Sequence, residues 1–209
     1  MSDFFSMKQF KTFTGGPLET NAYFLETEGG NVLFDAPEGA DARFAGSRID
    51  WLVLTHGHFD HTADAAKIQR RHHCKIAYHR LTAPMVTRAD FFHTWGYPIT
   101  IDPFQADRIL EECESCDIVG ATAKILHVPG HSPDSLCFYF PAYGTLVGGD
   151  VLFRGGVGRW DLPGGDGEAL FEGIRRKVFA LDGATVVLPG HGPATTVEIE
   201  RKTNPYVAG

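Results

Sequence analysis

The sequence predicts a mixed α/β fold in a single domain of residues 1–209. The chain has 209 residues, which is enough for one domain with a sizeable core. Hydrophobic residues make up 43% and charged residues 22%, as in globular proteins. Short apolar runs typical of strands alternate with segments of helical spacing, and this alternation is characteristic of α/β architectures.

The expected strands are short runs rich in β-branched or aromatic residues and bounded by Gly, Pro, Asp or Asn. They are 22–25, 32–34, 51–54, 75–78, 121–128, 136–140, 145–147 and 185–188. Residues 28–31, Glu-Gly-Gly-Asn, predict a hairpin turn between the first two strands.

Four segments are predicted as helices, namely 61–71, 105–112, 167–181 and 197–202. The clearest is 167–181, where apolar residues recur at helical spacing at Leu170, Ile174, Val178 and Leu181. Asp166 precedes it as a capping residue, so we expect this helix to begin there.

The charge and the N-terminus exclude several classes of function. The formal net charge of -7 offers no general attraction to a nucleic-acid backbone. Residues 1–10 lack the features of a secretory signal, and no apolar stretch is long enough to span a bilayer. Four cysteines without a disulfide-dense spacing fit a reducing compartment. We therefore expect a cytoplasmic protein with no nucleic-acid partner and no membrane association.

The densest chemical motif follows the expected strand 51–54, where residues 55–61 read Thr-His-Gly-His-Phe-Asp-His. Four groups able to bind a metal lie within six residues, namely His56, His58, Asp60 and His61. Imidazole and carboxylate suit zinc and similar metals. We expect Gly57 to let this loop bend sharply, because glycine accepts backbone angles that other residues avoid.

Three later strands also run into glycine-bearing turns that present His131, Asp150 and His191. Loops beyond the carboxyl ends of strands are the usual place for ligand sites in open α/β sheets. Seven donors are too many for one tetrahedral zinc ion. They suit two metals about 3.5–4 Å apart, as in two-metal hydrolytic sites.

This pattern, from Asn21 to Pro193, resembles the metallo-β-lactamase superfamily. The resemblance implies an αββα sandwich, two mixed sheets flanked by helices, with the metals at one edge between the sheets. It implies that one metal is bound by His56, His58 and His131, the other by Asp60, His61 and His191, with Asp150 bridging the two. Two zinc ions are the expected cofactors, with iron or manganese as alternatives at one or both sites.

Within the superfamily, residues 158–166 and the all-His/Asp donor set are most similar to the glyoxalase II-like, or hydroxyacylglutathione hydrolase-like, branch. The implied function is a metal-dependent thioester hydrolase for a small molecule such as an S-2-hydroxyacylglutathione. A metal-bridging hydroxide, oriented by Asp60 as catalytic residue, would attack the thioester or ester carbonyl. Because eighteen residues follow His191, we expect no C-terminal helical domain of the kind that supplies basic residues for glutathione.

Other functions remain open at this point. A persulfide dioxygenase with one iron can carry much of the same motif, and metal analysis with oxygen consumption would identify it. A lactonase would hydrolyse acyl-homoserine lactones with little thioester cleavage. A non-catalytic metal-binding module is disfavoured because structural zinc sites are closed and usually rich in cysteine. The acidic balance argues against a dinuclear nuclease.

Three further features have two interpretations each. Arg159 is a candidate for binding an anionic substrate group, or it holds its loop by pairing with Asp161 or Asp166. The aromatic residues of 88–98 either pack on the core or form a lid over the site. Cys113 and Cys116 could be a redox pair or half of a zinc site, but no second pair exists and acidic neighbours indicate an exposed loop.

The remaining histidines lack a motif, and we expect surface or core positions for His72, His73, His79, His93 and His127.

Overall fold

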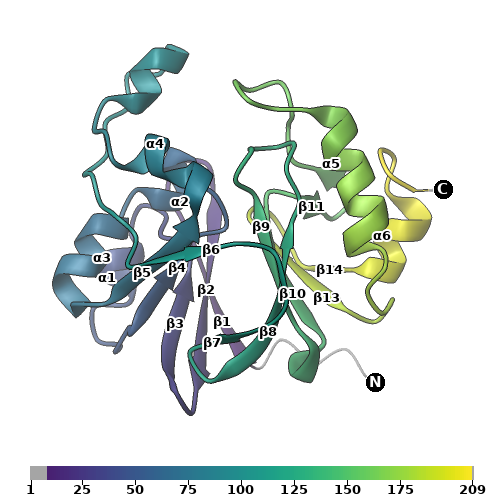
Figure 1. The fold of residues 1–209 in the computed structure, drawn as a ribbon, viewed down its shortest axis with the longest axis horizontal. Helices are drawn as coiled ribbons and strands as arrows, with labels where there is room; N and C mark the ends of the chain where they lie inside the picture. The colour runs from purple at the N-terminus through teal and green to yellow at the C-terminus, as the bar shows by residue number, and fades with distance from the viewer. Residues whose placement is uncertain (1–8, 209) are drawn as a thin grey trace.

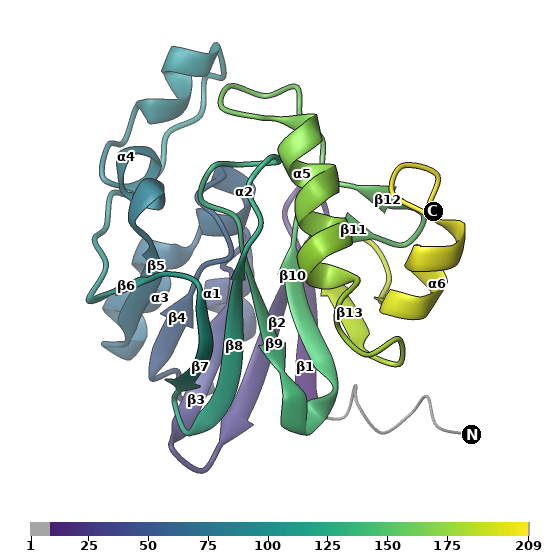
Figure 2. The same cartoon turned by 45° about the vertical axis from the view of Figure 1, so that its right-hand side comes forward.

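Two six-stranded sheets lie face to face, and helices cover the outer face of each (Figures 1 and 2). The structure, a computed structural model, describes residues 9–208. The four layers confirm the predicted αββα sandwich of two mixed sheets flanked by helices. Each sheet comes from one half of the chain, the first from residues 10–110 and the second from residues 113–196.

The first sheet has the strand order β1-β2-β3-β4-β5-β6. Its strands are β1 (Phe10–Gly15), β2 (Thr20–Thr27), β3 (Gly30–Phe34), β4 (Trp51–Val53), β5 (Lys75–His79) and β6 (Arg108–Leu110). β1, β2 and β3 pair antiparallel, with the expected hairpin turn between β2 and β3, and β3 to β6 pair in parallel. The carboxyl ends of the parallel strands therefore meet at one edge, where β4 delivers its histidine-rich loop.

The second sheet has the order β14-β13-β10-β9-β8-β7. Its strands are β7 (Cys113–Ile118), β8 (Ala121–His127), β9 (Leu136–Phe140), β10 (Thr145–Gly149), β13 (Val186–Pro189) and β14 (Thr195–Thr196). A separate hairpin joins β11 (Leu152–Phe153) to β12 (Gly156–Val157). Since β10 and β13 are parallel neighbours, the residues that follow them emerge side by side.

Helices cover both outer faces. On the first sheet they are α1 (Ala40–Arg43), α2 (Phe59–Thr62), α3 (Ala65–His72), η2 (Arg80–Thr82), α4 (Ala83–Val86) and η3 (Phe91–Trp95). On the second sheet they are α5 (Gly167–Gly173), the π-helix η5 (Ile174–Val178) and α6 (Val197–Thr203), while η4 (Pro141–Tyr143) connects β9 to β10. The carboxylate of Asp166 accepts a hydrogen bond from the backbone N–H of Ala169, so α5 begins where the capping residue predicted.

The core lies in three layers, one between the sheets and one under each helical face. Between the sheets, the rings of Phe34 and Phe138 are 5.2 Å apart and both side chains are buried. Leu170, Ile174 and Val178 are fully buried against the second sheet, as their spacing predicted. The inner layer is shared, and neither sheet could bury its inner face alone, which supports the proposal of a single domain.

Two expectations are wrong. Residues 105–112 are not a helix, because Arg108–Leu110 pairs in parallel with β5, and the Asp107 carboxylate accepts the backbone N–H of Ile76. Cys113 and Cys116 lie in β7 rather than in an exposed loop. In both places strand pairing outweighs the weak local preference.

The helix expected over 61–71 is divided into α2 and α3. At the junction, the Asp64 carboxylate accepts the backbone N–H groups of Gly39 and Asp41. No helix among residues 9–208 has the length and apolar composition needed to cross a membrane.

Candidate active site

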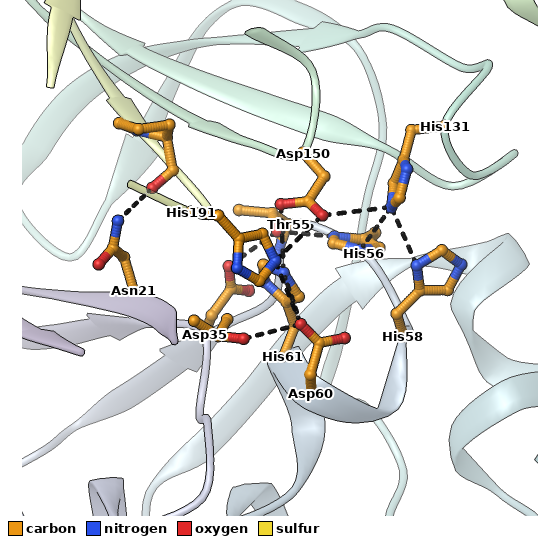
Figure 3. A network of polar contacts seen from close by, with 12 residues as sticks. Asn21, Asp35, Thr55, His56, His58, Asp60, His61, His131, Asp150 and His191 are labelled. Carbon is orange, nitrogen blue, oxygen red and sulfur yellow. Dashed lines mark hydrogen bonds and ion pairs between the residues drawn. The ribbon is translucent and has the colours of Figure 1, made fainter. Parts of the chain in front are cut away.

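All seven predicted metal-binding side chains converge at one edge of the sandwich, between the two sheets (Figure 3). The loop after β4 and the helix α2 carry His56, His58, Asp60 and His61. The turns after β8, β10 and β13 carry His131, Asp150 and His191. Five of the seven are buried, while the side chains of Asp60 and His191 keep 13% and 26% exposure toward the cavity described below.

The donor atoms form three overlapping groups, each with all atoms within 4.8 Å of one another. The groups are His56, His58 and His131; Asp60, His61 and His191; and His56, His61 and Asp150. Asp150 lies between the first two groups, with Oδ1 3.3 Å from Nε2 of His61 and Oδ2 3.4 Å from Nε2 of both His131 and His191. The single carboxylate of Asp150 can therefore reach both of these donor groups.

In four of the imidazoles, Nδ1 contacts an oxygen atom on the outer side of the site, and Nε2 faces the centre. Nδ1 of His131 contacts the carbonyl oxygen of Arg159 at 2.7 Å, and Nδ1 of His191 contacts that of Leu18 at 2.9 Å. Nδ1 of His61 contacts the Asp35 carboxylate at 2.8 Å. Nδ1 of His56 is 3.1 Å from the Thr55 hydroxyl, which itself donates to Asp35. Such outer oxygen partners fix the ring orientation of metal-binding histidines.

The donor set fits metal ions. Nε2 of His131 lies 3.2 Å from Nε2 of His56 and 2.9 Å from Nδ1 of His58, so lone pairs face one another. Four donors about 2.1 Å from one zinc ion lie about 3.4 Å apart, close to these separations. Nε2 of His61 and Oδ1 of Asp150 are buried without a hydrogen-bond partner among the described residues. A cation between the donors would satisfy both atoms.

Burial and the neighbouring charges shift the pKa values of the site residues, often in opposite directions. Burial would lower the pKa of His191, but the carboxylates of Asp150 and Asp60 raise it to about 10. Burial and the neighbouring His131 lower the pKa of His58 to about 3. Burial would raise the pKa of Asp60, but His61, His191 and the Thr20 hydroxyl bring it down to about 2. The carboxylates are therefore ionised at neutral pH, as metal ligands must be.

Several residues that support the site were not predicted from the sequence. Asn21 donates its side-chain amide to the carbonyl oxygens of Pro189 and Gly192, and Tyr23 donates its hydroxyl to that of Pro189. These bonds hold the His191 turn. Asp35, the buried partner of His61, directly follows a strand. The same position after a strand identified the metal-binding candidates in the sequence.

Two glycines have a steric role. A Cβ atom at Gly190 would lie 2.0 Å from Oδ1 of Asp150, so no larger residue fits there. At Gly57 a Cβ atom would lie 2.6 Å from Cε of Met85. The backbone of Gly57 is not in the left-handed region, so close packing against Met85 and Thr82, rather than the unusual backbone angle we expected, favours glycine there.

A cavity of about 570 Å³ opens over the cluster. Besides Asp60, Asp150 and three of the histidines, its lining contains Leu18, Phe59, Trp95, Tyr97, Phe153, Val157, Arg159 and Leu162. In the aromatic segment 88–98, Phe92 is buried in the core, and Trp95 and Tyr97 pack partly against the core and also line the cavity. The core interpretation is confirmed for Phe92, and the lid stays a prediction. Arg159 also lines it, but its guanidinium is paired with Asp161 at 2.8 Å.

Comparisons with known proteins agree with this geometry. The family model described as Metallo-beta-lactamase superfamily matches residues 15–191. The chain is 33% identical to the Probable metallo-hydrolase YqgX of Bacillus subtilis, over 93% of this chain and 95% of that protein. It is 35% identical to the Hydroxyacylglutathione hydrolase GloC of Haemophilus influenzae, over 75% of this chain and 74% of that protein.

Solved structures give the same result. The crystal structure of the BLEG-1 B3 metallo-beta-lactamase is 33% identical, with a TM-score of 0.86 over 96% of this chain and 100% of that one. TTHA1623 in a di-iron-bound form is 40% identical, with a TM-score of 0.83 over 94% of this chain and 99% of that one.

Proposed function

The chain belongs to the metallo-β-lactamase superfamily of metallo-hydrolases, and we propose from this premise that it is a dinuclear thioester hydrolase. The position of Asp150, within 3.4 Å of histidines from both donor groups, carries the proposal. The likeness to the relative named hydroxyacylglutathione hydrolase supports a thioester as substrate.

The proposed ligand assignment follows the donor atoms. His56, His58 and His131 would hold one ion through Nε2, Nδ1 and Nε2. Asp60, His61 and His191 would hold the other, with Asp150 shared. Zinc suits these nitrogen and oxygen donors, and iron is the alternative because a neighbour 40% identical is described as di-iron-bound. When bound, such a pair of ions lowers the pKa of coordinated water toward about 7 and polarises a carbonyl group.

Asp60 is the proposed catalytic residue. Its Oδ2 accepts a hydrogen bond from the Thr20 hydroxyl at 2.7 Å, which fixes the carboxylate at the floor of the cavity. Because Asp60 is ionised at neutral pH, it can accept a hydrogen bond from the attacking water and orient it toward the substrate carbonyl. A thiolate leaves without a proton donor, so we assign no separate acid.

The test is metal reconstitution followed by assay. Protein stripped with a chelator is loaded with zinc or with iron, and its metal content is counted per chain. We expect two zinc ions per chain and hydrolysis of S-lactoylglutathione or of an S-acyl thioester of an uncharged thiol. One iron per chain with oxygen consumption on glutathione persulfide would instead identify a dioxygenase.

Two other hydrolytic activities belong in the same assay. The likeness to a protein named a B3 metallo-beta-lactamase makes cleavage of a chromogenic cephalosporin the second activity to measure. Turnover of acyl-homoserine lactones would identify a lactonase. Either activity at a higher kcat/KM than every thioester would contradict the proposed function.

A further inference from the structure

The cavity over the donor cluster has apolar walls from both halves of the chain. Phe59, Trp95 and Tyr97 belong to the first half and pack against the core under its helices. Phe153, Val157 and Leu162 come from the second half, in and after the β11–β12 hairpin. Figure 1 shows α2 in the left half of the molecule and β11 in the right half, and these elements begin the two walls. The walls therefore enclose the cluster from two directions.

An aromatic ring stands at each end of the donor cluster. The Trp95 ring lies 5.6 Å from that of His58, in the first donor group. The Phe153 ring lies 6.0 Å from that of His191, in the second. A substrate whose carbonyl group reaches Asp60 and Asp150 would thus extend along apolar surface in either direction.

This apolar surface is not covered by the protein itself. Every apolar side chain that lines the cavity keeps part of its surface exposed, and Leu18 at the mouth is 52% exposed. Uncovered apolar surface costs free energy in water, and burying it against a ligand recovers about 25 cal/mol per Å². Concentration of such residues in one cavity marks a binding site for an apolar group.

The cavity offers little attraction to an additional anionic group beyond its donor cluster. Among the described residues that line it, Arg159 is the only lysine or arginine. Its Nε and Nη2 atoms each donate to the Asp161 carboxylate at 2.8 Å, so the charge is already offset. A thiol portion with carboxylates of its own, such as glutathione, would find on these walls a single cationic side chain, Arg159, which is already paired with Asp161.

We infer that the substrate is a thioester with a hydrophobic acyl group and a thiol portion of no net charge. This inference rests on the proposed hydrolase function and specifies its substrate class. In the reaction, the oxygen of water bonds to the acyl carbon and the C–S bond breaks. The sulfur leaves as a thiolate with the electron pair of that bond and then takes up one proton of the water. The other proton is released to solvent, and the acid leaves as a carboxylate.

The experiment measures how the rate depends on acyl length. Zinc-loaded protein is given S-acyl derivatives of N-acetylcysteamine, an uncharged thiol, from acetyl to octanoyl, with S-lactoylglutathione alongside. We expect kcat/KM to rise about three- to fourfold per added methylene until the cavity is filled, the gain of burying one CH₂ group. We also expect the longer acyl substrates to exceed S-lactoylglutathione at least tenfold.

Variants locate the effect in the cavity. Trp95→Ala should flatten the rise of kcat/KM with acyl length. Leu162→Gln on the opposite wall should also flatten it, and this variant tests the cavity if Trp95→Ala impairs folding. Ile199→Ala, an exposed residue on α6 that does not line the cavity, is the matched control and should keep the full rise.

The outcomes separate the two proposals. Hydrolysis at rates independent of acyl length, or a preference for S-lactoylglutathione, would overturn the substrate class and leave the thioester hydrolase standing. An unchanged rise in both cavity variants would also overturn it. Failure of the zinc-loaded protein to cleave any thioester would overturn the proposed function itself.

Discussion

Asp35 and His61 are joined by a hydrogen bond of 2.8 Å between the carboxylate and Nδ1, in the buried layer behind the proposed metal centre (Figure 3). The same carboxylate accepts the backbone N–H and the hydroxyl of Thr55, the residue before His56. Asp35 has a φ of 60°, a left-handed conformation that costs about 1–3 kcal/mol in a residue other than glycine. Its three hydrogen bonds offset this cost.

Replacement of Asp35 should therefore weaken metal binding. In Asp35→Asn the carboxylate that orients His61 becomes a neutral amide, and loss of such an outer partner typically lowers metal affinity about 10–100-fold. Competition with a chromophoric chelator measures the change. Asp50→Asn is the matched control, because Asp50 accepts the backbone N–H of Asn31 and is not among the candidate donors. Equal affinities in the two variants would refute this role of Asp35.

Asp60→Asn should reduce kcat by about 10²–10⁴-fold, the usual contribution of a positioned acid or base. The amide keeps the shape of the side chain but removes the charge that orients the attacking water. Because Asp60 is also a proposed ligand, the rate is expressed per metal-loaded chain. An undiminished rate on that basis would exclude the catalytic role.

Gly190→Ala should disable the site although position 190 supplies no donor atom. The added Cβ would lie 2.0 Å from Oδ1 of Asp150 and 2.8 Å from Cε1 of His61, so the shared carboxylate must move. A displacement of about 1 Å can cost about 10²-fold in rate. Metal content and kcat/KM measure the effect. Gly46→Ala, where nothing lies within 4 Å of the new atom, should change neither quantity.

Metal binding should release protons at pH 7.5. In the metal-free protein the carboxylates of Asp60 and Asp150 outweigh burial and raise the pKa of His61, and they raise that of His191 to about 10. The His191 imidazole therefore carries an additional proton at this pH, which an incoming cation must displace. We expect at least one proton released per two ions, and affinity that rises with pH up to about 10. Titration calorimetry in buffers of different ionisation enthalpy counts them, and a count of zero would contradict the assignment.

The fold and the donor cluster could largely be predicted because several local patterns agree with the tertiary structure. Residues 167–181 combine a capping Asp166 with apolar residues at helical spacing. The structure has helix from Gly167 to Val178 and buries Leu170, Ile174 and Val178, while Leu181 lies beyond the helix and is only partly buried. The donors follow strand ends, and parallel strands bring their ends to one edge. The spacing of the motif in residues 55–61 then determined most of the candidate set.

Edge strands and supporting contacts could not be predicted in the same way. β6 is only three residues long, with two of them exposed, so it carries too little apolar pattern to separate it from a helix. Asn21 and Tyr23 contact a turn more than 160 residues away. Such long-range pairing depends on the packing of the two sheets, which local spacing does not encode.

The division of the donors between the two sheets gives the proposed ions a mechanical role. Each of the three donor groups contains members from both halves of the chain, so neither half can complete a coordination sphere alone. Any ion bound there is a cross-link at the open edge of the sandwich, and its binding free energy resists separation of the halves. Chelation should therefore loosen the very edge through which substrate enters.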